Sequence, residues 1–381
     1  MKIVADENIP FVKECFSSVG EVTTVSGRAV TSRLVRDADV LLVRSITQVN
    51  EALLSGSGVR FVATATIGME HVDREYLASE GIGFASAPGS NSNSVAEYVT
   101  AALLALGKKH KIELAGKRIG VVGVGNVGSK VAMKAAALGM TPVLNDPPLA
   151  RQTGDGKYRP LSEVCGCDFV TMHTPLTREG VDRTYHLADE AFFSALKPGC
   201  FFVNTSRGGV ADTAALKRAL AGGRLRGAVL DVWENEPNID GELILKADLS
   251  TPHIAGYSFD GKVLGLIMIY RAACAHFGLD VRHDVGDFLP KPPVPTVRIE
   301  GSVEDEQAVI HDAVQQVYVI NRDDFNTREI LLAPREDRGR FFDDLRKNYP
   351  TRREFQNTTV EGAGAESSLG RKLAGIGFRV V

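Results

Sequence analysis

Residues 120–128 read Gly-Val-Val-Gly-Val-Gly-Asn-Val-Gly and decide the fold of the central part of this chain. The apolar start predicts a buried strand, and the apolar pattern of residues 130–138 predicts a helix after it. Between the two, Gly123 allows a tight turn, Gly125 lets the backbone approach a phosphate, and Gly128 allows the helix to pack closely on the strand. The helix N-terminus attracts anions, and Asn126 and Val127, between the glycines, are predicted to contact the cofactor. The stretch therefore predicts a dinucleotide-binding turn.

A glycine-rich turn can also end an ordinary βα unit, so the next strand matters. It is expected at residues 141–144 and ends just before Asp146. An acid about 20 residues beyond the glycine motif commonly binds the 2′-hydroxyl of the adenosine ribose. The charge of Asp146 would repel a 2′-phosphate, so we predict NAD rather than NADP as the cofactor.

Composition excludes several other classes of protein. The chain has 381 residues, 44% of them hydrophobic, with a net charge of −3. This charge gives no general reason to bind nucleic acid or an anionic membrane. The N-terminus begins with a strand and carries acids, so we expect no signal peptide, and no apolar run approaches the ~20 residues of a spanning helix. The five cysteines are scattered, which favours a cytoplasmic protein without disulfides and without a metal site.

Three domains are expected along the chain. Residues 1–93, completed by 258–289, alternate short strands with helices and predict a doubly wound parallel sheet without a glycine fingerprint. Residues 94–257 hold six expected strands, which suits a doubly wound Rossmann domain. A long helix over 93–111 links the two, with Ser94 and Glu97 at capping-box spacing. Residues 290–381 follow a proline-rich break, and their charges alternate in sign, so we expect a small α/β domain used for oligomerisation or bracing.

Polar residues follow three of the expected Rossmann strands, at the edge where open α/β sheets bind ligands. Arg207 follows the strand at 201–204 and is placed to bind a carboxylate. Three acids, among them Asp231 and Glu236, follow the strand at 228–232. His253 follows the strand at 248–250, behind a proline and before a Gly-Tyr turn, and is better placed for chemistry than a structural histidine.

Together these segments resemble the D-isomer-specific 2-hydroxyacid dehydrogenases over residues 1 to about 280, and the order and spacing of Arg207, Glu236 and His253 carry most of the resemblance. It implies that Arg207 binds the substrate carboxylate and 2-oxygen. His253 would take the 2-hydroxyl proton as hydride leaves C2, and Glu236 would hold His253 and favour its protonated form. The residues implied to line NAD are Thr174, Thr205, Ser206, Arg207, Asp231 and Gly256; neighbouring His173 is expected to be a wall or structural residue.

Three further segments, residues 43–50, 145–148 and 253–258, resemble a member of this family that acts on a small phosphorylated 2-hydroxy acid. That member carries a C-terminal dimerisation domain, which implies a homodimer. The implied substrate contacts are Ser45, Thr66 and Tyr257. We add Arg44, since a phosphorylated acid needs cationic donors, although a structural ion pair is the alternative.

Other functions stay open at this point. A 3-phosphoglycerate dehydrogenase would use the same three catalytic residues, with residues 296–381 as a regulatory module. Formate dehydrogenase is disfavoured because its histidine pairs with Gln rather than with Glu236. An NAD-sensing corepressor would need a peptide-binding surface, which nothing in the sequence marks.

Overall fold

A computed structural model describes residues 1–300 and 304–381, and the chain divides into two compact units. Unit 1 comprises Met1–Asn91 and Ser258–Lys291, and unit 2 comprises Ser92–Tyr257 and Pro292–Val381. No helix in the described ranges is both long and apolar enough to cross a bilayer.

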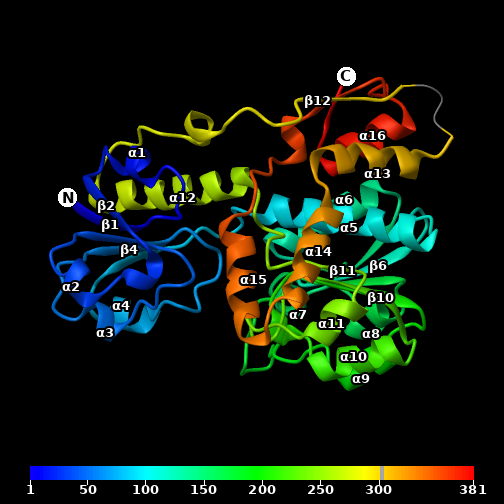
Figure 1. Ribbon diagram of the computed structural model, residues 1–381, viewed down its shortest axis with the longest axis horizontal. Helices are drawn as coiled ribbons and strands as arrows, with labels where there is room; N and C mark the ends of the chain where they lie inside the picture. Colours follow the sequence, from blue (N-terminus) through cyan, green and yellow to red (C-terminus); the bar gives the residue numbers. More distant parts are fainter. Residues whose placement is uncertain (301–303) are drawn as a thin grey trace. The chain divides into compact units, whose positions relative to one another are not determined.

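Unit 1 is a five-stranded parallel sheet in the order β2-β1-β3-β4-β5, the flavodoxin-like doubly wound order. Its strands are apolar runs because a parallel sheet is covered on both faces. Helix α12 lies along one face (Figure 1), and the shorter helices α2, α3 and α4 cover the other. The bounds are β1 Lys2–Asp6, α1 Val12–Phe16, β2 Glu21–Val25, α2 Ser32–Val35, β3 Val40–Val43, α3 Glu51–Leu54, β4 Phe61–Thr64, α4 Arg74–Ser79, β5 Gly83–Ala85 and α12 Phe259–Phe277.

Unit 2 is built on a six-stranded parallel sheet in the order β11-β10-β9-β8-β6-β7. Tyr158 adds a single parallel bridge beside β7, at the position of a further edge strand. The chain adds β7 on one side of β6 and then returns to add β8 on the other side, with all strands parallel. Ligands of doubly wound sheets bind at such a switch point in the strand order. The bounds are α5 Ser92–His110, β6 Arg118–Val122, α6 Asn126–Ala137, β7 Thr141–Asn145, α7 Pro147–Thr153, α8 Leu161–Cys165, β8 Phe169–Met172, α9 Glu190–Ala195, β9 Cys200–Asn204, α10 Thr213–Ala221, β10 Leu225–Leu230, α11 Gly241–Lys246 and β11 Leu249–Ser250.

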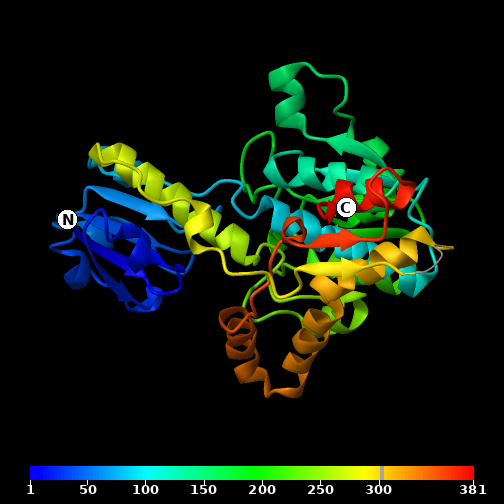
Figure 2. The same cartoon turned by 90° about the horizontal axis from the view of Figure 1, so that it is seen from above.

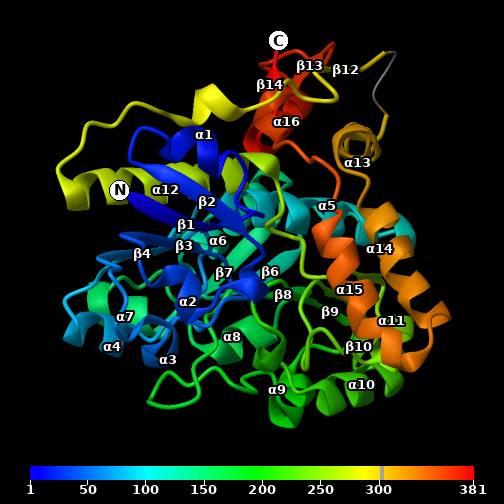
Figure 3. The ribbon, with the colours of Figure 1, turned by 60° about the vertical axis from the view of Figure 1, so that its left-hand side comes forward.

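The C-terminal part of unit 2 adds a small parallel sheet in the order β12-β13-β14 and four helices. Helix α13 packs on α5 (Figure 3), α16 packs on α6, and α14 packs on β11. One hydrophobic core runs from the Rossmann sheet into this part, so residues 292–381 and 92–257 form a single compact unit. The bounds are β12 Thr296–Arg298, α13 Glu306–Val317, α14 Ile320–Arg328, α15 Arg338–Lys347, β13 Thr359–Glu361, α16 Ser368–Ile376 and β14 Arg379–Val380.

The predicted fold class is confirmed: two doubly wound parallel sheets and a small C-terminal α/β part. The capping box predicted at the start of α5 is wrong. Glu97 is buried and accepts hydrogen bonds from Asn93 and from the backbone N–H of Phe355, 3.0 Å away, while Ser94 donates to the carbonyl of Ala255. Because α5 is covered on several sides, these polar side chains serve tertiary contacts rather than the helix end.

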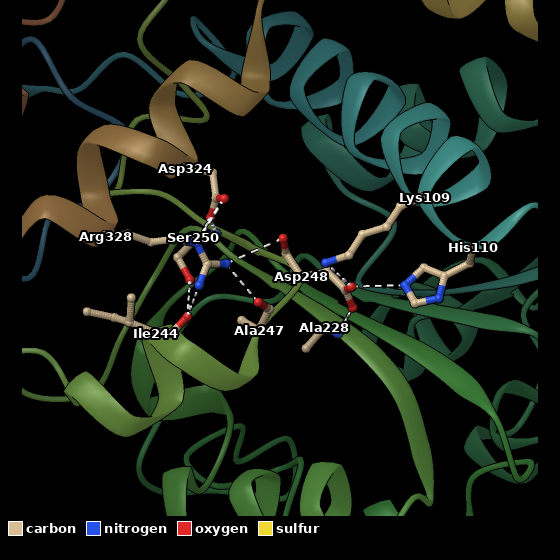
Figure 4. A network of polar contacts seen from close by, with 9 residues as sticks. All are labelled: Lys109, His110, Ala228, Ile244, Ala247, Asp248, Ser250, Asp324 and Arg328. Atoms are coloured by element: carbon tan, nitrogen blue, oxygen red, sulfur yellow. Dashed lines mark hydrogen bonds and ion pairs between the residues drawn. The ribbon is translucent and has the colours of Figure 1, made fainter.

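Helix α14 closes the outer edge of the Rossmann sheet. Asp324 accepts a 2.7 Å hydrogen bond from the backbone N–H of Ser250 on β11, and Arg328 binds Asp324 and the carbonyls of Ile244 and Ala247 (Figure 4). An edge strand exposes unpaired backbone groups, and Asp324 satisfies the N–H of Ser250 on this one. Beside it, Asp248 accepts from His110, Lys109 and the backbone of Ala228, so the last turn of α5 is fixed to the same edge.

Candidate active site

Three loops at the carboxyl edge of the unit 2 sheet carry the predicted catalytic residues. Arg207 follows β9, Glu236 lies in the loop after β10, and His253 follows β11. These strands are neighbours in the sheet, so their loops emerge side by side.

Glu236 and His253 form a hydrogen-bonded pair. Glu236 Oε2 lies 2.8 Å from His253 Nδ1, and Glu236 Oε1 accepts a 2.8 Å hydrogen bond from the backbone N–H of Trp233. Burial raises the pKa of the Glu236 carboxyl, but the His253 charge, these hydrogen bonds and the Arg346 guanidinium together lower it below its ordinary value. Glu236 is therefore an ionised acceptor that fixes one ring nitrogen and leaves Nε2 of His253 for proton transfer.

Asp231 holds the turn that carries His253. Its carboxylate, buried at the end of β10, accepts hydrogen bonds from the Thr251 hydroxyl at 2.6 Å and from the backbone N–H groups of Ile254 and Ala255 at 2.8 and 3.0 Å. His253 itself has a left-handed backbone with φ of 58°. This conformation costs about 1 to 2 kcal/mol in a residue other than glycine. The contacts of Asp231 on both sides of His253 explain why the strained turn persists.

Trp233 contacts both of the other loops. A Cβ atom at Gly208 would lie 1.9 Å from the Trp233 carbonyl oxygen, so only glycine allows the Arg207 loop to approach the loop after β10 this closely. The indole Nε1 of Trp233 donates a 2.9 Å hydrogen bond to the carbonyl of Thr251 in the third loop. Arg207 is half-buried on this framework, and its guanidinium donates to the carbonyl of Ser206 at 2.8 Å.

The three acids after β10 have separate roles. Glu236 binds His253, and Asp231 binds the turn around it. Glu234 instead accepts from His186 at 2.7 Å and from the backbone N–H of Thr213 at 2.9 Å, so it fixes a neighbouring loop.

The glycine turn has the geometry of a phosphate-binding turn. Gly123 has φ of 86°, and a Cβ at Gly128 would lie 1.9 Å from the Gly123 carbonyl oxygen, so both positions need glycine for the protein's own packing. A Cβ at Gly125 would meet no protein atom within 4 Å. Gly125, Asn126 and Val127 lie at the N-terminus of α6, where backbone N–H groups have no intrahelical partner. These residues fit a dinucleotide whose pyrophosphate approaches the open space over Gly125.

Asp146 and Thr174 border the same sheet edge. Asp146 accepts hydrogen bonds from the backbone N–H groups of Val124 at 2.8 Å and Leu149 at 3.0 Å, so it also caps α7. Each carboxylate oxygen keeps a further lone pair for a ribose hydroxyl. Thr174 Oγ1 is buried without a hydrogen-bond partner among the described residues, as expected of a group that serves a ligand.

His173 lies beside Thr174, and its ring bonds to two threonine hydroxyl groups. Its ring nitrogens lie 2.9 Å from Thr171 Oγ1 and 3.3 Å from Thr205 Oγ1. Burial lowers the pKa of His173 to about 3, so the ring is neutral at physiological pH. A structural role fits this environment better than that of a second base.

The predicted substrate contacts Arg44, Ser45 and Thr66 lie on unit 1, after the neighbouring strands β3 and β4. Ser45 is exposed, and Arg44 donates a 3.4 Å hydrogen bond to the carbonyl of Asn8. Thr66 Oγ1 lies 2.7 Å from Thr64 Oγ1 and also bonds to the carbonyl of Gly68. No ion pair of Arg44 is found within the described part of unit 1.

The C-terminal part adds two arginines that the sequence did not mark. Arg346 lies over the ring of Tyr257, with 5.8 Å between its Cζ atom and the ring centroid. Buried Arg352 donates a 2.6 Å hydrogen bond to the carbonyl of Ala255. Both come about a hundred residues after His253, in a segment of mixed charges, so no local motif could identify them. No group of three or more potential metal ligands is found in residues 1–300 and 304–381.

Comparison with known proteins gives full-length relatives. The chain is 42% identical over 380 residues to the erythronate-4-phosphate dehydrogenase of Hahella chejuensis, covering 100% of this chain and 99% of the relative. The chain belongs to the erythronate-4-phosphate dehydrogenase family. Residues 95–255 match the family model described as the D-isomer specific 2-hydroxyacid dehydrogenase, NAD binding domain, and residues 288–377 match a domain of unknown function, DUF3410.

Two similar solved structures each match about three quarters of this chain. D-lactate dehydrogenase from Aquifex aeolicus, complexed with NAD and lactic acid, is 26% identical with a TM-score of 0.59, over 73% of this chain and 96% of that one. The TT0316 protein from Thermus thermophilus is 26% identical with a TM-score of 0.65, over 74% of this chain and 98% of that one. About a quarter of this chain, a member of the erythronate-4-phosphate dehydrogenase family, thus lies outside each match.

Proposed function

We propose that this chain catalyses the NAD-dependent oxidation of 4-phospho-D-erythronate to (R)-3-hydroxy-2-oxo-4-phosphooxybutanoate, a step of pyridoxal 5′-phosphate (vitamin B6) biosynthesis. The observation that carries the proposal is the Glu236–His253 pair, 2.8 Å apart, in a chain 42% identical along its whole length to an erythronate-4-phosphate dehydrogenase.

In this proposal the protein's own residues orient the acid and move one proton. Arg207 binds the substrate carboxylate and polarises the C2–O bond, because a guanidinium forms paired hydrogen bonds with such oxygens. His253 Nε2 accepts the proton of the 2-hydroxyl, and Glu236 stabilises the imidazolium that results. Bound NAD supplies the acceptor for the hydride that leaves C2. The substrate thus loses one hydride and one proton and becomes the 2-oxo acid.

NAD is proposed to bind at the switch point of the unit 2 sheet. The Gly123–Gly128 turn would receive the pyrophosphate and Asp146 the adenosine ribose, while the loop residues line the nicotinamide side. The proposed lining residues are Thr174, Thr205, Ser206, Arg207, Asp231 and Gly256. Asp231 also positions His253, because its carboxylate accepts hydrogen bonds from the backbone N–H groups of Ile254 and Ala255. The proposed substrate contacts are Arg44, Ser45, Thr66 and Tyr257.

A substrate panel tests the proposed activity. The purified chain is incubated with NAD and, in separate reactions, 4-phospho-D-erythronate, 3-phosphoglycerate, D-lactate or formate, and both NADH and the organic product are measured. We expect turnover of 4-phospho-D-erythronate alone at a substantial rate. Faster turnover of 3-phosphoglycerate would support the alternative 3-phosphoglycerate dehydrogenase, and NAD binding without any turnover would support a corepressor. The Arg207→Ala variant should be nearly inactive.

A cytoplasmic homodimer that pairs through residues 290–381 completes the proposal. Helices α14 and α15 form a helical hairpin (Figure 2) that exposes large apolar side chains, including Phe325 at 63% and Leu332 at 85%. Exposed apolar side chains gathered on one element commonly mark a protein interface. Light scattering on the full chain should give a dimer, and the Phe325→Asp/Leu332→Asp double variant should give a monomer. A double variant that stays dimeric would exclude this hairpin as the pairing surface.

A further inference from the structure

Helix α15 presents one face to the catalytic loops of unit 2. Gly339, at its first turn, packs so closely that a Cβ there would lie 2.7 Å from the Asn238 side chain and 3.3 Å from Pro237, directly after Glu236. Phe342, one turn later, is fully buried in the core that also contains Trp233. Arg346 comes a further turn along the same face. This spacing directs the side chain of Arg346 toward the site rather than into solvent.

Arg346 brings a positive charge to the active site that the protein neutralises only in part. Its guanidinium lies over the Tyr257 ring, and its Nη1 atom lies 3.9 Å from Asp343 Oδ1. Its Nε atom is buried without a hydrogen-bond partner among the described residues. The side chain is 22% exposed, so a ligand can reach it. Burial lowers the pKa of Arg346, but Tyr257 and Glu236 raise it above its ordinary value, and the Arg346 guanidinium in turn lowers the pKa of Glu236, so Arg346 lies near the acid/base pair. A buried N–H donor of a charged group is costly unless a partner binds it.

We infer that Arg346 is a specificity-determining residue that binds the phosphate group of the substrate, next to Tyr257. The inference rests on the proposed function and names a residue for a part of the substrate that the catalytic residues leave unbound. Arg207 and His253 bind the carboxylate and the 2-oxygen, whereas a phosphate dianion needs a separate cationic donor. A guanidinium offers a planar fork of N–H donors that matches phosphate oxygens.

The location of Arg346 in the chain supports this assignment. Arg346 lies in residues 288–377, which match a family model of their own. The full-length relative named for a phosphorylated acid covers this region, because its match includes 100% of this chain. The D-lactate dehydrogenase named with lactic acid, which has no phosphate, matches 73% of the chain. If the C-terminal part supplies the phosphate donor, its packing against the loops of Glu236 and His253 has a functional reason.

The test compares Arg346→Gln, Arg346→Lys and the wild type, with Arg340→Gln as the matched control. Arg340 lies on the same helix, is 68% exposed and pairs with Asp337. The first measurement is the affinity of each NAD-loaded protein for inorganic phosphate by calorimetry. The second is kcat/KM for 4-phospho-D-erythronate and for D-erythronate, which lacks the phosphate. We expect Arg346→Gln to bind phosphate about 10- to 100-fold more weakly than wild type, with Arg346→Lys in between and Arg340→Gln unchanged.

The kinetic ratio separates phosphate binding from a purely structural role. In Arg346→Gln, kcat/KM for 4-phospho-D-erythronate should fall about 10- to 100-fold more than kcat/KM for D-erythronate. Equal losses on both substrates, or phosphate affinity equal to that of the wild type, would overturn the inference. If the wild type oxidises neither substrate, the proposed function fails, and the phosphate titration still decides the role of Arg346. Equal unfolding temperatures of the variants show that the comparison concerns binding rather than folding.

Discussion

Arg352 donates a 2.6 Å hydrogen bond to the carbonyl of Ala255, two residues after His253. The same carbonyl accepts from the hydroxyl of Ser94, and the backbone N–H of Ala255 donates to Asp231. The guanidinium of Arg352 also lies over the ring of Tyr318, with 4.3 Å between Cζ and the ring centroid. The turn that carries the proposed acid/base is thus held from the Rossmann sheet on one side and from the C-terminal part on the other.

Replacing Arg352 with Met should loosen this turn. The variant keeps most of the side-chain volume but leaves the Ala255 carbonyl with one donor fewer and removes the ring contact, so we expect a loss of about 2 to 3 kcal/mol in the free energy of unfolding. At a temperature where the variant is folded, kcat should fall about tenfold or more, because a misplaced His253 transfers the proton poorly. Urea unfolding and steady-state kinetics measure the two effects. Exposed Arg298, paired with Glu361, is the control, and Arg298→Gln should change the stability by about 0.5 kcal/mol or less. A destabilised Arg352→Met enzyme with wild-type kcat would show that Arg352 serves only the fold.

Replacing Glu236 with Gln should lower kcat/KM about 100-fold or more, since the imidazolium loses its negative partner and the ring loses its fixed orientation. The rate of oxidation falls at low pH because His253 must be neutral to accept a proton. Without the Glu236 charge the imidazolium loses its negative partner, so the acid limb of kcat/KM should move to lower pH. Glu234→Gln is the control, because Glu234 bonds to His186 and Thr213 and should leave the acid limb in place. A shift toward higher pH in Glu236→Gln would contradict the pairing.

The sequence predicted the two sheets because their strands are apolar runs separated by turn residues. The glycine turn was recognisable for a different reason. Gly123 has a positive φ and Gly128 packs too closely for any side chain, so both positions require glycine. Helix α14 was not predicted. Its sequence, INRDDFNTR, is mostly polar, and the helix is held by tertiary pairs such as Arg328 with Asp324 rather than by an apolar stripe.

Hydrogen-bond partners that lie far apart in the chain could not be predicted from the sequence either. Glu97 matches a capping box in spacing, yet it bonds to Phe355, which is 258 residues away along the chain. Arg346 and Arg352 reach the catalytic loops only because the C-terminal part packs on the Rossmann sheet. Residue type and spacing predict the chemistry proposed for Arg207, Glu236 and His253, but only the packing shows which distant side chains contact their loops.

Replacing Asp146 with Asn should relax the preference for NAD. Asn is as good a helix cap as Asp, so the hydrogen bond that starts α7 should survive, and the change removes mainly the negative charge. Weaker repulsion of a 2′-phosphate should raise the NADP-to-NAD ratio of kcat/KM about tenfold. Asp189→Asn, at the cap of α9, changes the same chemical group away from the glycine turn and should leave the ratio unchanged. An unaltered ratio in Asp146→Asn would show that Asp146 does not face the ribose.

Replacing His173 with Asn should make the protein more resistant to acid. Burial lowers the pKa of His173 from 6.5 in the unfolded chain to about 3 in the folded protein. Between these values the unfolded state binds a proton that the folded state does not, so the stability of the wild type falls as the pH drops below about 6.5. At pH 5.5 this linkage costs about 1 kcal/mol, and the cost is absent in a variant without the imidazole.

Urea unfolding at pH 7.5 and pH 5.5 measures this linkage. The stability lost between the two pH values should be about 1 kcal/mol smaller in His173→Asn than in the wild type, whatever the absolute stability of the variant. The difference between pH values matters because Asn also changes the contacts with Thr171 and Thr205. Equal losses in His173→Asn and the wild type would mean that His173 takes up a proton in the folded protein, and a role as a second acid or base would then have to be tested.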